Sequence, residues 1–116
     1  MSSLASDFAG SGGLTVSQVA PPAGTVVQKA ITVGTTAVRC TVSGSSPIST
    51  RSRLFVTPDP ASTANFFIGA STVASSGANR GTPIAPGEHF ASDFDAGDYY
   101  IISDTVAQTF FITEQY

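Results

Sequence analysis

Apolar and polar residues alternate with a period of two in the middle of the chain, the spacing that places successive side chains on opposite faces of a β-strand. In the stretch RSRLFV, Leu54 and Val56 fall on one side, whereas Arg51, Arg53 and Phe55 fall on the other. The pattern predicts a strand whose inner face carries Leu54 and Val56.

A second alternating stretch follows a turn that is marked by two prolines. Pro58 and Pro60 have no amide hydrogen and a fixed φ, so no regular ladder or helix continues through TPDPAST. Beyond the turn, Phe66 and Ile68 share one side of the chain and Phe67 lies on the other. We therefore expect Phe66 and Ile68 to be buried in the same core as the first strand.

Further strands are predicted on both sides of this pair. The β-branched runs VVQKAITV and TAVRCTV flank Gly34 and predict a hairpin around residues 33–36. Residues 74–97 are rich in Gly, Pro and Ser and have room only for short strands, around Ile84 and residues 89–91. DYYIIS and AQTFFITEQY complete about six to eight short strands without a helical period, which predicts an all-β fold, a small antiparallel β-sandwich or barrel.

The first part of the chain differs in amino-acid composition from the rest. Residues 1–24 are mainly Ser, Gly, Ala and Pro, and they predict an extended N-terminal arm before a β-sandwich domain at residues 25–116. Such an arm can attach to a neighbouring subunit through its sparse apolar side chains, although a tail without contacts is the alternative. The candidate contact residues in the arm are Leu4, Phe8, Leu14 and Val16.

The arm has no basic residue and no apolar run long enough for a signal peptide. Elsewhere no stretch approaches the roughly 20 apolar residues of a transmembrane helix. We therefore expect the protein to be made in the cytoplasm and to be free of membrane contact.

The chain is unusually poor in charge. Asp, Glu, Lys and Arg make up 11% of the residues, against about 25% in a typical soluble domain. Because a free monomer normally keeps a charged surface, this deficit predicts that other subunits cover much of the surface. The net charge of −3 also argues against binding to nucleic acid.

Few residues suggest a chemical site. Cys40 is the only cysteine, so the chain has neither an intrachain disulfide nor a multi-cysteine metal site, and we expect Cys40 to be buried in a strand. His89 is the only histidine, and with Asp93 and Asp95 it makes too weak a ligand set for zinc. No GxSxG motif is present. We expect a protein that is not an enzyme and that uses no metal and no cofactor.

The arginines are the polar candidates for contacts between subunits. Arg51 and Arg53 share one side of a predicted strand, where their guanidinium groups can pair with carboxylates of a neighbouring chain. A solvated strand face is the alternative. Arg80, in the loop-rich region, is the third candidate contact residue.

Adjacent aromatic residues place a ring on each face of the predicted sheets. One face fills the core, and the other needs a second surface to cover it. The pairs are Phe66 and Phe67, Tyr99 and Tyr100, and Phe110 and Phe111.

In their order along the chain, these segments resemble a family of small tailed-bacteriophage virion proteins. The resemblance covers roughly residues 25–115 and ends on an acidic residue, Glu114, after an aromatic strand. The segments that carry it are ITVGTTAVRCTVSG, RSRLFV, FFIGASTV, RGTPIAPGEHF and YYIIS.

The resemblance implies a structural component of the virion. Together with the arm and the compact β-domain, it suggests a capsid decoration (cement) protein on the capsid surface. Such a protein binds the major capsid protein, is usually a homotrimer, and stabilises the expanded head. A tail, head-fibre or baseplate accessory module is the first alternative. A carbohydrate-binding β-sandwich that uses Tyr99, Tyr100 and Asp95 is the second, although the chain lacks the tryptophan expected for sugar stacking.

Overall fold

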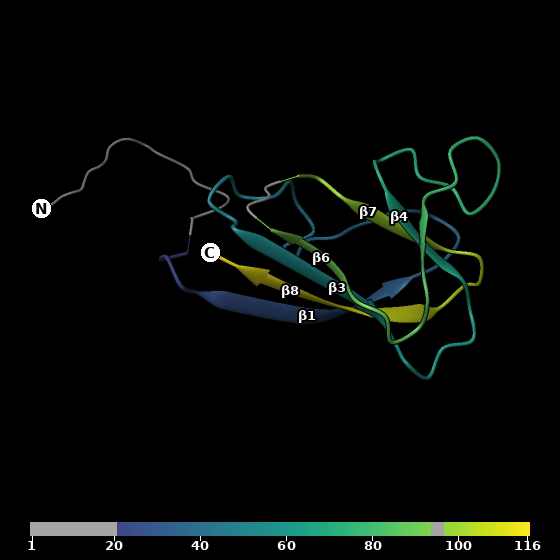
Figure 1. Ribbon diagram of the computed structural model, residues 1–116, viewed down its shortest axis with the longest axis horizontal. Helices are drawn as coiled ribbons and strands as arrows, with labels where there is room; N and C mark the ends of the chain where they lie inside the picture. Colours follow the sequence, from purple (N-terminus) through teal and green to yellow (C-terminus); the bar gives the residue numbers. More distant parts are fainter. Residues whose placement is uncertain (1–20, 94–96) are drawn as a thin grey trace, which may run out of the picture.

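The computed structural model describes residues 21–93 and 97–116, which form eight β-strands and no helix. Two antiparallel four-stranded sheets make up the fold: sheet A in the order β1-β8-β3-β6, and sheet B in the order β2-β7-β4-β5 (Figure 1). The predicted all-β fold is confirmed as a small β-sandwich. The strands are β1 (Val26–Val33), β2 (Val38–Arg39), β3 (Arg53–Pro58), β4 (Phe66–Gly69), β5 (Thr82–Ile84), β6 (Phe90–Asp93), β7 (Tyr100–Ser103) and β8 (Gln108–Gln115).

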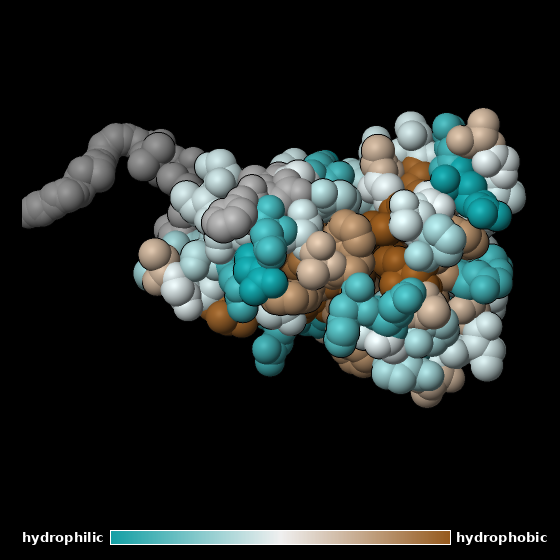
Figure 2. All heavy atoms as spheres, viewed as in Figure 1, coloured by the Kyte–Doolittle hydropathy of each residue, from teal (hydrophilic) through white to brown (hydrophobic). Residues whose placement is uncertain are grey.

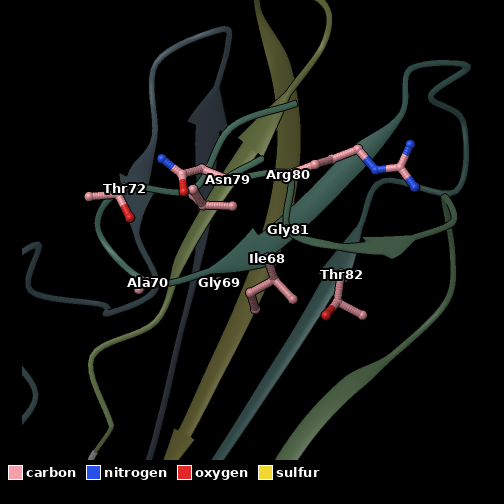
Figure 3. A pocket seen from close by; sticks show the side chains of 9 residues that line it. Ile68, Gly69, Ala70, Thr72, Asn79, Arg80, Gly81 and Thr82 are labelled. Carbon is pink, nitrogen blue, oxygen red and sulfur yellow. The ribbon is translucent and has the colours of Figure 1, made fainter. Parts of the chain in front are cut away.

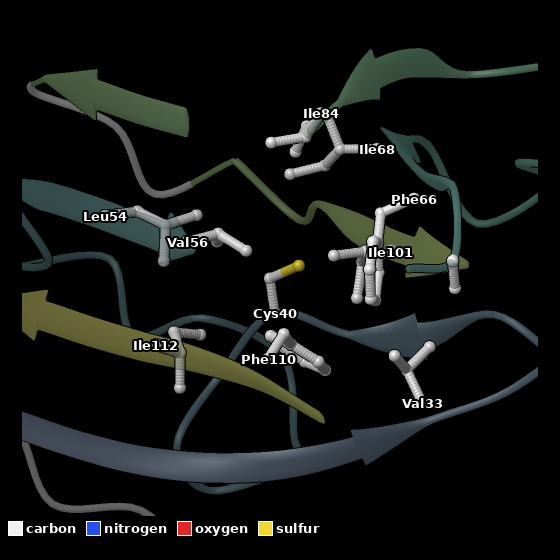
Figure 4. Close-up of a cluster of buried hydrophobic side chains, with 11 residues drawn as sticks. Val33, Cys40, Leu54, Val56, Phe66, Ile68, Ile84, Ile101, Phe110 and Ile112 are labelled. Atoms are coloured by element: carbon white, nitrogen blue, oxygen red, sulfur yellow. The ribbon is translucent and has the colours of Figure 1, made fainter. Parts of the chain in front are cut away.

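The core lies between the two sheets, where the alternating residues of each sheet meet. The predicted inner residues Leu54, Val56, Phe66 and Ile68 are all buried. Cys40 is fully buried, as expected, but it directly follows β2 instead of lying within a strand, and its side chain lies among the core residues of both sheets (Figure 4). Hydrophobic residues come to the surface near the middle of one side of the molecule, with hydrophilic residues around them (Figure 2).

The predicted hairpin around residues 33–36 is wrong. β1 belongs to sheet A and β2 to sheet B, so the chain crosses between the sheets at this point. β1 pairs along its whole length with the equally long β8, whereas β2 contributes only two residues to a ladder with β7. The longer ladder satisfies more backbone hydrogen bonds, and Gly34 supports the crossing by accepting a hydrogen bond from the Ser103 amide at 2.9 Å.

The loop between β4 and β5 folds back over the outer face of sheet B (Figure 3). Phe67, predicted on the outer side of its strand, is buried there with Val73 and Ile102 in a second small core. A Cβ atom on Gly81 would lie 2.5 Å from the Ile68 carbonyl oxygen and from a Val73 methyl group, so only glycine allows this close approach. At Phe67 the second surface that the paired rings require is supplied by the chain itself, through the β4–β5 loop.

The described chain begins with a turn at the start of β1. The Thr25 amide donates to the Pro22 carbonyl oxygen at 3.1 Å, and Gly24 has a φ of +86°. The predicted contact residues Leu4, Phe8, Leu14 and Val16 lie outside the described residues. Nothing in the described part of the chain is a helix that could cross a membrane.

Candidate interaction surface

The outer face of sheet A is an ordered array of uncharged side chains. The ladders of β1, β8, β3 and β6 align their outward residues in rows across the sheet. One row contains Ala30, Phe111 and Thr57, and the next contains Gln28, Thr113, Phe55 and Ala91. We call these seven residues, with Thr32 and Thr109 of the row beyond, the uncharged face.

Phe111 is the prominent residue of the uncharged face. Its side chain is 43% exposed, whereas its neighbours Phe110 and Ile112 on the same strand are buried. Beside it is an open depression of about 280 Å³ whose lining includes Ala30, Thr113 and, at the sheet edge, the charged Lys29. A large exposed ring among small and hydroxyl-bearing side chains is typical of a surface that another molecule covers.

Arg53 closes one end of the uncharged face. Its guanidinium lies 2.5 Å from a carboxylate oxygen of Asp93, directly across the ladder, and 4.6 Å from the centroid of the Phe55 ring. The charge of Arg53 is therefore balanced within the chain, and its planar group extends the surface of the ring. A contact of Arg53 with a neighbouring chain stays a prediction.

Arg51 does not lie on this surface. The regular strand begins only at Arg53, and the chain before it carries the Arg51 side chain into the end of the sandwich, where it is buried. Its guanidinium donates to Glu114 at 2.9 Å, to the Cys40 carbonyl oxygen at 3.3 Å and to the Gly97 carbonyl oxygen at 2.6 Å. The prediction that Arg51 pairs with a neighbouring chain is thus corrected, because its carboxylate partner is internal.

Arg80 lies on the loop that covers sheet B. Its guanidinium is 5.6 Å from the centroid of the Phe67 ring, and the side chain extends outward from the loop (Figure 3). An open depression of about 270 Å³ is lined by this loop, by β4 and by the start of β5, and its polar side chains are Thr72, Asn79, Arg80 and Thr82. Arg80 remains exposed and available to a partner.

The other chemical candidates are engaged within the chain. His89 Nδ1 is 2.7 Å from the Thr57 hydroxyl, and Asp93 pairs with Arg53. The described residues contain no group of three or more His, Cys, Asp or Glu side chains that could hold a metal ion. Asp95 lies outside the described residues.

The tyrosines proposed for sugar binding also have partners. The Tyr99 ring packs edge to face against Phe90, with centroids 5.2 Å apart. The Tyr100 ring lies 5.4 Å from the guanidinium of Arg39, which Asp98 holds in an ion pair at 3.0 Å. Both rings are therefore already in contact with other side chains of the chain, and neither is a free surface on which a sugar could stack.

No protein family, curated protein sequence or solved structure matches this chain.

Two features of this region were only partly visible in the sequence. The alternation of Phe110, Phe111 and Ile112 predicted a ring on each face of the strand, but it did not show which ring is left exposed. The pairing of Arg51 with Glu114 joins residues 63 positions apart, and no local pattern indicates it.

Proposed function

We propose that this protein is a non-enzymatic structural component of a tailed-bacteriophage virion, a capsid decoration (cement) protein that binds the major capsid protein. The uncharged face of sheet A is the observation that carries the proposal. It combines an exposed phenylalanine with alanines, threonines and a glutamine, in a chain with only 11% charged residues.

The composition of the face suits a permanent partner rather than water. Burying a charge without a partner is costly, whereas small apolar groups and hydroxyls that find hydrogen bonds are buried at low cost. The charges near Phe111 lie at the borders of the face: Lys29 lines the depression beside Phe111 and remains exposed, and the Arg53 charge at the rim is already balanced by Asp93. A central ring with a polar rim is the usual anatomy of a protein interface.

The size of the face indicates that it does not act alone. Four strands spaced about 4.8 Å apart, over about seven residues at 3.4 Å each, give roughly 450 Å². A standard interface buries about 800 Å² on each partner. In the proposed role the N-terminal arm supplies the remaining contacts, with Leu4 and Phe8 as candidate anchors on the major capsid protein.

The proposed role is mechanical. A protein that binds only the expanded shell stabilises that state by mass action, in proportion to its affinity and its free concentration. Self-association into a homotrimer at a local threefold position would multiply the contacts of each attached unit. The site of action is the outer capsid surface.

The test is attachment to purified expanded shells that lack the protein. Phe111→Lys places a charge at the centre of the uncharged face, and we expect a large loss of bound protein at limiting concentration. Ser76→Lys is the matched control, because Ser76 is exposed on the β4–β5 loop away from this face. The control should attach like the parent protein.

Two results would contradict the proposal. Equal occupancy of parent and Phe111→Lys would show that another surface makes the attachment. Density confined to the tail in images of the particle would support a tail, head-fibre or baseplate accessory module instead.

A further inference from the structure

β1 is a long strand at the edge of sheet A. It spans Val26–Val33, and within the described chain it pairs only with β8. The amide and carbonyl groups on its other side have no strand beside them in the described residues. An open edge of this length is a template for another strand.

The segment that precedes this strand has a matching pattern. Residues 14–20 read LTVSQVA: apolar and polar side chains alternate from Leu14 to Ser17, and Thr15, Val16 and Val19 are β-branched. An antiparallel pairing that sets Val16 opposite Ile31 also sets Leu14 opposite Val33, and it places Gln18 opposite Lys29. Apolar residues then meet apolar residues on the inner side, and an amide meets the ammonium group.

We propose that residues 14–20 of one copy pair with the free edge of β1 in a second copy, adding a fifth strand to its sheet A. Main-chain hydrogen bonds provide the affinity in this kind of strand addition, and the alternating side chains provide the register.

The turn before β1 favours a second copy over the same chain. A tight two-residue hairpin needs a positive φ at its first central residue, because other turns splay the two strands. In the turn from Pro22 to Thr25 only Gly24, the second central residue, has a positive φ. Pro21 and Pro22 also lack the amide hydrogens that a partner strand would donate. The geometry of this turn therefore does not favour a hairpin between residues 14–20 and the β1 strand of the same chain.

Lys29 disfavours a direct pairing of the β1 edges of two copies. It belongs to the inward-facing set of β1, opposite Ile112, yet it is exposed because it lies at the sheet edge. Direct pairing of two β1 edges would bring two such ammonium groups together, and an inward-pointing charge on an edge strand is a known barrier to that pairing. An uncharged donor segment avoids this repulsion.

The donor segment and the acceptor edge are different surfaces, so two copies can exchange segments in a closed dimer, or several copies can follow one another head-to-tail. This assembly uses the edge of sheet A and leaves its uncharged face open. The inference therefore holds or fails independently of the proposed capsid role.

Engineered cysteines test the register. Thr15 and Thr32 are opposite one another in the proposed pairing, and Thr32 is exposed. The full chain with Thr15→Cys is mixed with a mass-tagged full chain carrying Thr32→Cys and then oxidised. We expect a disulfide between the two chains. A mixture with Gln28→Cys in place of Thr32→Cys is the matched control and should give only background, while the native Cys40 is buried and does not compete.

A backbone substitution provides the second measurement. Ser17→Pro removes an amide donor that faces the β1 edge in this register, because the even-numbered residues of β1, such as Ala30 opposite Ser17, point their backbone groups away from β8. Ser3→Pro is the control outside the segment. In sedimentation equilibrium, Ser17→Pro should lose the self-association that the parent and Ser3→Pro retain. Equal crosslinking to both β1 positions, a monomeric parent chain, or an intramolecular disulfide in the Thr15→Cys/Thr32→Cys double variant would overturn the inference.

Discussion

Arg51 and Glu114 form a buried ion pair, with Nη1 of the arginine 2.9 Å from Oε2 of the glutamate. The other carboxylate oxygen, Oε1, accepts the Val42 amide at 3.0 Å, and the guanidinium also donates to the Cys40 carbonyl oxygen. The pair thus fastens the end of β8 to the chain that follows β2. It connects the two sheets at one end of the sandwich.

Removing one member of this pair should destabilise the fold strongly. Arg51→Met leaves the Glu114 carboxylate buried without its cation, a change that costs about 3–5 kcal/mol. Arg53→Met is the matched control, because Arg53 pairs with Asp93 at the surface and such pairs contribute about 1 kcal/mol or less. Urea denaturation of both variants measures the difference, and similar midpoints would contradict the structural role of Arg51.

Adjacent rings on β8 should respond very differently to truncation. Phe110 is fully buried, so Phe110→Ala should cost about 3–5 kcal/mol through lost contacts and a cavity. Phe111→Ala removes a ring that is 43% exposed and should change the free energy of unfolding much less. Thermal melting provides the comparison; a larger loss in Phe111→Ala would mean that the two faces of sheet A are reversed.

Gly81→Ala should disturb the loop that covers sheet B. The added methyl group would lie 2.5 Å from the Ile68 carbonyl oxygen, and the backbone cannot yield without moving the loop. We expect Phe67 to become accessible and the loop to be cut faster in limited proteolysis. Ser76→Ala, at an exposed position of the same loop, should be cut at the parent rate, and an unchanged rate in Gly81→Ala would disprove the tight contact.

The buried thiol should make stability depend on alkaline pH. Burial raises the pKa of Cys40 to about 12, so above its ordinary pKa the unfolded chain has lost a proton that the folded chain keeps. The free energy of unfolding therefore falls as the pH rises from the ordinary thiol pKa towards about 12. Below the ordinary thiol pKa, the protonated buried thiol makes its full contribution to stability.

Urea denaturation over that pH range, compared between the parent and Cys40→Ala, isolates this effect. The parent should lose stability more steeply, by up to about 1.4 kcal/mol for each pH unit. The slopes are compared rather than the absolute values, because the substitution also leaves a small cavity. Parallel slopes would show that the thiol is more accessible than its position indicates.

Side-chain alternation predicted the faces of the strands but not their neighbours. Leu54, Val56, Phe66 and Ile68 were placed correctly in the core because burial on a strand follows a period of two that is visible locally. The partner of β1 was not predicted, because β8 lies at the other end of the chain and turn signals near Gly34 favoured a local hairpin. A short window of sequence contains no signal for pairing between residues so far apart in the chain.

The candidate surface was predictable only in part. The low charge and the paired rings indicated that some face is covered by a partner, but Phe67 proved to be covered by its own chain and Phe111 did not. Arg51 and Arg53 share the same alternation, yet only Arg53 lies within the strand, so the pattern could not be extended back to Arg51. Side-chain alternation applies only within the strand, so the residues before its first position do not follow it.

The pairing of β1 with β8 sets the order in which the chain can fold during translation. β1 leaves the ribosome first, but its only partner among the described strands ends at Gln115. Of the strands that follow one another in the described chain, only β4 and β5 are neighbours within a sheet, so almost every ladder must wait for distant residues. Folding dominated by such non-local contacts is slow. The newly made chain therefore cannot complete sheet A until β8 has been synthesised, because β8 is the strand that joins β1 to β3.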